Sequence, residues 1–90
     1  MTVTSWTYPP ELVEALERFG MRPRPDTPPA LVRGALHDLY RYELRRVRDQ
    51  LRAGALHRPA YLERVVALRK QYWPLTLQLP AWERICRGDG

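Results

Sequence analysis

The stretch DLYRYELRRVRDQLR, residues 38–52, sets five arginines and three acidic residues among apolar side chains spaced at a helical period. On a helical wheel, the apolar side chains of this stretch and its flanks fill one continuous arc. That arc contains Val32, Leu36, Leu39, Tyr40, Leu44, Val47 and Leu51. The pattern predicts a long helix over about residues 28–53, with one face buried against other helices.

A second helical segment follows after Gly54, which is a natural end for the first helix. Pro59 is suited to begin a helix and Pro74 to stop one, so we expect a helix over about residues 59–73. Its apolar side chains are Tyr61, Leu62, Val65, Val66, Leu68, Tyr72 and Trp73. Because the connection is short, the two helices should form an antiparallel helical hairpin.

Proline-rich segments flank this hairpin on both sides. Pro9 and Pro10 predict the start of an N-terminal helix over about residues 9–19, which should pack against the hairpin. After residue 74, leucines alternate with polar residues between two prolines, and this period of two predicts an extended C-terminal tail. A short helix over about residues 81–87 should follow the extended part.

The expected fold class is therefore all-α. It comprises an antiparallel helical hairpin, a packed N-terminal helix and an extended, proline-bounded C-terminal tail. A chain of 90 residues is the size of one domain, so we expect residues 1–90 to form a single small helical domain. A domain of this size has little room for an enclosed active site.

One charged residue interrupts each apolar arc of the predicted hairpin. Glu43 lies within the first arc and Arg69 within the second, and both are equally distant in sequence from Leu56 in the turn. An unpaired buried charge is very costly. We therefore predict a structural ion pair between Glu43 and Arg69 that sets the register of the hairpin. The alternatives are that the pair lines a cleft for a ligand or partner, or that one of the two reaches solvent.

The positive charge is concentrated in the second part of the chain. Residues 31–90 carry a net charge of +6 and residues 1–30 a net charge of −1, and fourteen of the fifteen basic residues are arginine. Four arginines form what we term the arginine row, on the arc of the long helix away from its apolar side chains: Arg41, Arg45, Arg48 and Arg52. Tyr42 lies beside them.

Three interpretations of the arginine row are open. The one we adopt is a partner-binding surface for an acidic protein, with Tyr42 contributing an aromatic contact. The second is a nucleic-acid surface, on which the arginines contact phosphates while Tyr42 and Tyr72 stack on unpaired bases. The third is a solvated helix face with local ion pairs, for example between Arg45 and Asp49.

Catalytic and metal-binding patterns are absent from the sequence. His37 and His57 are twenty residues apart, and Cys86 is the single cysteine. The glycines are isolated and form no phosphate-binding loop. We therefore expect a non-catalytic protein with no cofactor and no metal.

The sequence also bears on membrane association and cellular location. No apolar run reaches the roughly 18–20 residues that span a bilayer, and the N-terminus lacks the pattern of a secretory signal. We therefore expect no membrane association and a cytoplasmic location. Pairing of the hairpin with a second copy into a four-helix bundle is also open.

Overall fold

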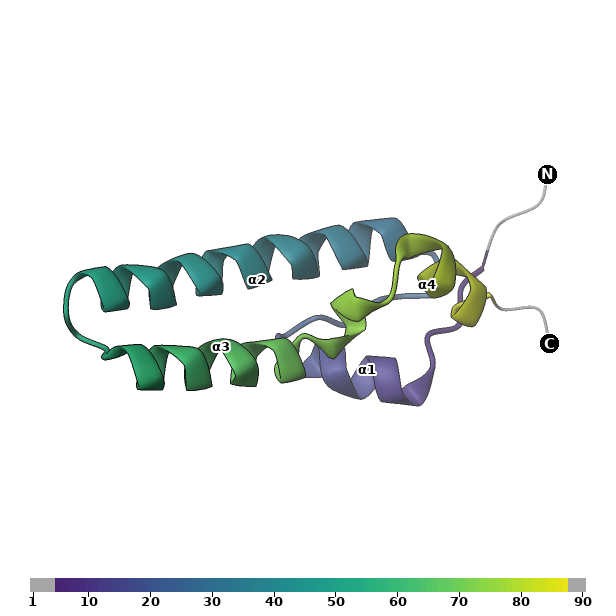
Figure 1. The fold of residues 1–90 in the computed structure, drawn as a ribbon. Helices are drawn as coiled ribbons and strands as arrows, with labels where there is room; N and C mark the ends of the chain where they lie inside the picture. Colours follow the sequence, from purple (N-terminus) through teal and green to yellow (C-terminus); the bar gives the residue numbers. More distant parts are fainter. Residues whose placement is uncertain (1–4, 88–90) are drawn as a thin grey trace.

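The computed structural model describes residues 5–87, and over this range the chain is helical apart from its connections. In order, the elements are α1 (Pro10–Glu17), α2 (Pro29–Arg52), α3 (Arg58–Gln71), the 3-10 helix η1 (Trp73–Thr76) and α4 (Leu79–Ile85). Figure 1 shows α2 and α3 side by side in opposite directions, with α1 and α4 gathered at the end away from their turn. The all-α prediction is confirmed.

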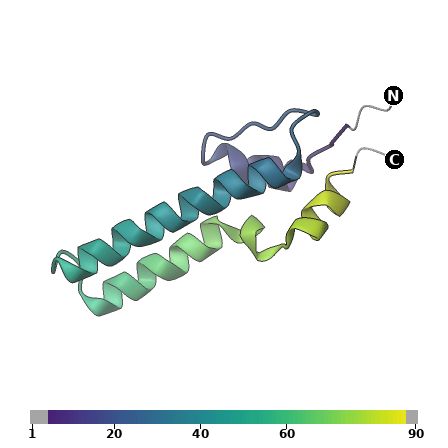
Figure 2. The same ribbon diagram turned by 90° about the horizontal axis from the view of Figure 1, so that it is seen from above.

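The molecule is elongated because α2 and α3 extend beyond the other helices. Its principal extents are 56 × 21 × 19 Å, and its radius of gyration is 15.9 Å. A compact domain of this length would have a radius of gyration of about 12 Å. We call residues 41–71 the hairpin arm. Only α2 and α3 form this arm, side by side (Figure 2). A helix with its side chains is about 10 Å across, so the arm is thin.

Prolines and glycines set the ends of the helices. Each of the four α-helices has a proline in its first two positions, where no intrahelical donor is needed. Gly20 follows α1 and Gly54 follows α2, with φ angles of 74° and 79°. These left-handed conformations favour glycine and turn the chain out of each helix. None of the helices in residues 5–87 is both long and apolar enough to cross a membrane.

The core lies where α1, α4 and the end of α3 meet α2. Its buried members are Leu12, Leu16, Val32, Leu36, Val47, Leu68, Tyr72, Trp82 and Cys86. The ring of Tyr72 stacks against Phe19, with 4.3 Å between ring centroids, and against Tyr40, with 5.0 Å. Tyr72 thus joins Phe19, just beyond α1, to α2 and to the end of α3.

The C-terminal tail is helical, and the prediction of an extended segment is wrong. Pro74 and Pro80 each lie in the first turn of a helical element, η1 and α4, where proline is well tolerated. The indole Nε1 of Trp82, which is fully buried, donates to the carbonyl oxygen of Pro74 at 2.8 Å. This contact within the tail folds it into turns despite its alternating leucines.

Arg33 on α2 ties this tail to the hairpin. Its Nε donates to the carbonyl oxygen of Leu77 at 2.9 Å, and one terminal nitrogen donates to the carbonyl oxygen of Leu75 at 3.4 Å. Leu75 lies in η1 and Leu77 directly follows it, and carbonyls at the end of a short helix lack intrahelical partners. A single arginine therefore replaces the backbone donors that a continuous helix would supply.

We call residues 20–28, between α1 and α2, the proline-rich strap. The N-terminal segment connects this strap to the C-terminal end. The backbone N–H of Trp6 donates to Pro25, and that of Thr7 donates to Cys86, both at 2.7 Å. The hydroxyl of Tyr8 donates to the carbonyl oxygen of Thr27 at 2.6 Å. Residues 6–8 thus connect two segments that are distant in sequence, residues 25–27 and the end of α4, at one end of the molecule.

Candidate functional site

All four members of the arginine row are exposed on α2. They lie on the face opposite the buried residues, since Arg45 is nine positions from Leu36 and therefore about 180° around the helix. The side-chain hydrogen bonds within residues 5–87 involve none of the four. The predicted row is thus a set of guanidinium groups whose donors point to solvent.

The hairpin arm accounts for the whole net positive charge of the protein. Residues 41–71 contain nine basic and three acidic side chains, a net charge of +6, whereas the rest of the chain has a net charge of −1. Because the arm is thin, these charges lie close together around two exposed helices. Such a concentration attracts anionic partners over roughly a Debye length.

Tyr42 lies beside the row, with 55% of its surface exposed. The guanidinium carbon of Arg46 lies 6.0 Å from the centroid of its ring. This cation–π contact between neighbouring helical turns holds Arg46 next to the ring. Tyr42 therefore offers an aromatic surface at the edge of the arginine row, as the sequence predicts.

Glu43 has a different partner from the predicted one. Its Oε2 accepts a hydrogen bond from the hydroxyl of Tyr72, and Arg69 is exposed. Tyr72 is three residues beyond Arg69, which is slightly less than one helical turn. Tyr72 therefore lies on nearly the same side of α3 as Arg69, and its hydroxyl reaches Glu43 in place of the predicted guanidinium.

A tyrosine is the less costly partner at this position. It donates a hydrogen bond to the carboxylate without a second charge being removed from water. Burial, together with the hydrogen bond and the negative charge of Glu43, raises the pKa of Tyr72 well above its usual range. The phenol therefore remains protonated and continues to donate at physiological pH.

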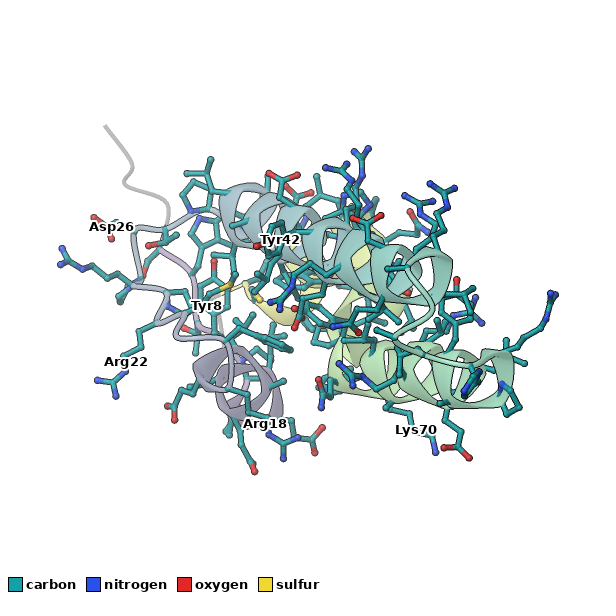
Figure 3. All side chains as sticks on the ribbon, turned by 90° about the vertical axis from the view of Figure 1, so that its left-hand side faces the viewer. Tyr8, Arg18, Arg22, Asp26, Tyr42 and Lys70 are labelled. Atoms are coloured by element: carbon teal, nitrogen blue, oxygen red, sulfur yellow. The ribbon has the colours of Figure 1, made fainter. Side chains whose placement is uncertain are left out.

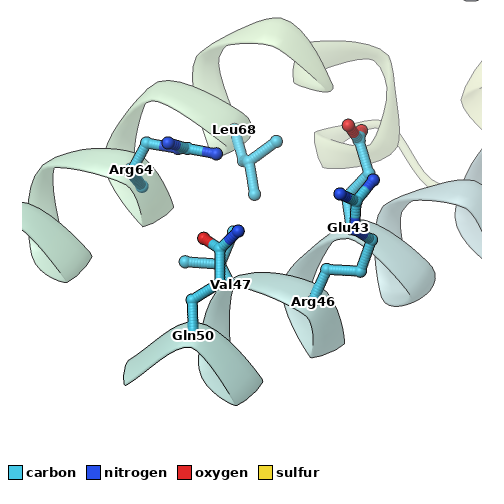
Figure 4. A pocket seen from close by; sticks show the side chains of 6 residues that line it. All are labelled: Glu43, Arg46, Val47, Gln50, Arg64 and Leu68. Atoms are coloured by element: carbon cyan, nitrogen blue, oxygen red, sulfur yellow. The ribbon is translucent and has the colours of Figure 1, made fainter. Parts of the chain in front are cut away.

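One polar groove between α2 and α3 was not predicted from the sequence. Figure 4 shows Arg46 and Gln50 on α2 and Arg64 on α3 around this groove, which Glu43, Val47 and Leu68 also line. Its volume is about 80 Å³, far below the roughly 300 Å³ of a typical small-molecule pocket. Only the packing of α3 against α2 places Arg64 and Arg46 around the same groove, so sequence spacing could not reveal it.

Catalytic or metal chemistry has no support in the described residues. No group of three or more histidine, cysteine, aspartate or glutamate side chains within residues 5–87 is placed to hold a metal ion. Cys86 is fully buried, and burial raises the pKa of its thiol to about 11, so its reactive thiolate form is disfavoured.

Comparison of this chain with protein-family models, with curated proteins and with solved structures found no match.

Proposed function

We propose that this chain is a non-catalytic adaptor or accessory protein that presents its arginine row to an acidic protein partner. One observation carries the proposal. Four exposed arginines share one face of an arm with a net charge of +6, and no side-chain hydrogen bond within residues 5–87 occupies them.

The spacing of the row suggests the shape of the partner. Arg41 and Arg52 are eleven residues apart, or about 16 Å along α2. A second helix with acidic residues at the same intervals of four, three and four would also carry its carboxylates along one face. Each guanidinium can contact a carboxylate through two parallel N–H donors. An acidic helix packed along α2 could thus engage all four arginines.

Such contacts are individually weak at an exposed surface, at about 0.2–1 kcal/mol each. Affinity would come from their number and from an aromatic contact with Tyr42. Complementary charge would mainly raise the association rate and select the partner. With a single buried cysteine and no expected disulfide, we place this activity in the cytoplasm, with no cofactor.

Nucleic acid is the second candidate, because the same arm could contact phosphates. Tyr42 is exposed and could stack on an unpaired base. Tyr72 is only 2% exposed, so its predicted stacking role is not available. Four phosphate contacts on a duplex would give a salt slope of about −3.6 in log–log form, which is a specific expectation for this alternative.

The test is fluorescence anisotropy with two kinds of labelled probe, at low and at physiological salt. One probe is a helical peptide with glutamates at intervals of four, three and four residues, and the others are single- and double-stranded oligonucleotides. The row variant is Arg45→Glu/Arg48→Glu. The matched control is Arg22→Glu/Arg24→Glu, which makes the same change in charge at exposed positions of the proline-rich strap.

We expect the peptide to bind the wild type and the control, and the row variant to lose at least tenfold in affinity. Tight oligonucleotide binding that falls steeply with salt and depends on the row would favour the second candidate instead. Equal binding of the peptide by the row variant and its control would show that the row is only a solvated face.

A further inference from the structure

The outer face of α3 is apolar, although no other element of residues 5–87 covers it. Leu62 is 54% exposed and Val66 is 49% exposed, and Ala67 beside them is exposed as well. Leu68 and Tyr72, on the opposite side of the helix, are buried. α3 is therefore apolar on both of its sides, whereas α2 presents arginines on its outer side.

The hairpin arm has no third helix within residues 5–87 that could cover this apolar face. Each helix of a two-helix arm can bury only the face that it turns toward the other. Leu62 and Val66 are four residues apart and form one stripe on the remaining face of α3. They border a shallow hollow together with Glu63, Ala67 and Lys70. Burying this stripe requires a surface from outside the hairpin.

We propose that the outer face of α3 pairs with the same face of a second copy of this chain, with the two helices antiparallel. The charges beside the stripe support this occupant. Glu63 and Lys70 are seven residues apart, or about two turns, so both border the same edge of the stripe. Both side chains are exposed, and Figure 3 shows Lys70 projecting from the side of α3 away from α2.

An antiparallel pair uses these two charges symmetrically. With the two-fold axis near Val66 and Ala67, Glu63 of each copy lies beside Lys70 of the other. The symmetry makes this contact twice. The same arrangement brings Val66 of the two copies together, while Leu62 of each copy lies nine residues from its counterpart and beside the aliphatic stem of Lys70 of the other copy. A single contact surface is thus complementary to itself in both charge and apolarity.

The two arginine rows do not oppose this pairing directly. They lie on the side of α2 away from α3 and would therefore be on the two outer surfaces of the dimer. Arg69 does oppose it, because it lies on the other edge of the stripe in both copies. Its guanidinium can extend into water while its stem stays on the apolar surface.

The size of the face indicates a weak dimer. α3 has 14 residues and is about 21 Å long. A single helix face of this length is smaller than the roughly 800 Å² per partner of a standard interface. We therefore expect association that depends on concentration and that the flanking charges control.

The experiment is analytical ultracentrifugation of the full chain from about 10 µM to about 1 mM. The mean mass should rise with concentration from 10.6 kDa toward twice that value. Val66→Glu should abolish the rise while circular dichroism remains unchanged, because the side chain is half exposed. A monomer at every concentration, or a dimer that Val66→Glu leaves intact, would overturn the proposal.

Charge exchange gives a second and more specific readout. Glu63→Lys and Lys70→Glu should each weaken the dimer by about tenfold, because each creates two like-charge contacts across the interface. An equimolar mixture of the two variants should associate again, since opposite charges then face each other at both contacts of the mixed dimer. Glu14→Lys, at an exposed position of α1, is the control and should leave the dimer unchanged. Failure of the mixture to associate would overturn the antiparallel arrangement.

Discussion

The hydroxyl of Tyr72, at the end of α3, donates a hydrogen bond to the carboxylate of Glu43 in the middle of α2. The ring that carries this hydroxyl also stacks on Phe19 and Tyr40. One side chain therefore sets the register of the hairpin and attaches the end of α1 to it. The half-buried carboxylate, which would otherwise be an unpaired charge at the edge of an apolar interface, has a hydrogen-bond donor from the core.

Tyr72→Phe should lower the free energy of unfolding by about 1–2 kcal/mol. The substitution keeps the aromatic stack and removes the donor to the half-buried carboxylate of Glu43, which water can replace only in part. Urea denaturation of the two proteins measures the difference. An unchanged midpoint would mean that the hydrogen bond contributes nothing to stability.

A double-mutant cycle separates this hydrogen bond from the predicted ion pair. Glu43→Gln and Tyr72→Phe should be coupled by about 1 kcal/mol, whereas Glu43→Gln and Arg69→Gln should be additive. Coupling in the Arg69 cycle alone would show that Glu43 pairs with Arg69 in solution.

Gly34→Ala should stabilise the protein by about 1 kcal/mol. Gly34 is exposed within α2, its φ is not positive, and no atom lies within 4 Å of the position that a Cβ would take. Alanine therefore gains helix propensity at no steric cost. Thermal unfolding measures the change.

Gly54→Ala is the matched control, and its effect should have the opposite sign. Gly54 also has open space around it, but its φ of +79° is costly for any residue with a Cβ, by about 1–2 kcal/mol. Destabilisation by both substitutions would contradict the assignment of Gly34 to an open helix face.

The sequence predicts the helices of this fold better than the partner of Glu43 or the structure of the C-terminal tail. The 3.6-residue period of apolar side chains and the positions of the prolines locate α2 and α3 to within two residues. The period of two in Leu75, Leu77 and Leu79 is misleading, because Trp82 and Arg33 hold this segment in turns. The contacts of Arg33 join residues more than forty positions apart, and that of Trp82 spans eight residues, so neither follows from the local period of two.

The candidate site divides in the same way. A helical wheel suffices to place the arginine row on one exposed face, because that placement depends on α2 alone. Which side chain bonds to Glu43, and which side chains share the groove with Arg46, depend on how α3 packs against α2. Arg69 and Tyr72 are close to one helical turn apart on nearly the same side of α3, so the residue pattern fits either of them as the partner of Glu43.

Arg33→Met should destabilise the protein by about 1–2 kcal/mol and should loosen α4 in particular. Methionine keeps much of the aliphatic stem but removes both donors to the carbonyl oxygens of Leu75 and Leu77. Hydrogen exchange followed by mass spectrometry should show faster exchange in residues 75–86, with less change in α2. The control is Arg41→Met in the exposed arginine row, for which we expect less than about 0.5 kcal/mol. Equal effects of the two substitutions would contradict a tethering role for Arg33.

Stability should decrease in alkaline solution. Burial raises the pKa of Cys86 to about 11, and burial followed by the charge of Cys86 raises that of Tyr8 to about 12. The folded state thus retains protons that the unfolded chain releases, and stability falls as pH rises. The loss should begin near pH 9, close to the usual thiol pKa of about 8.5, and should approach about 1.4 kcal/mol per pH unit for each group. Urea denaturation between pH 7 and pH 11 tests this.

Cys86→Ala should delay the onset of the loss to about pH 10, where tyrosine ionises in the unfolded chain. Tyr42→Phe should not move the onset. Constant stability of the wild type up to pH 11 would contradict burial of both groups.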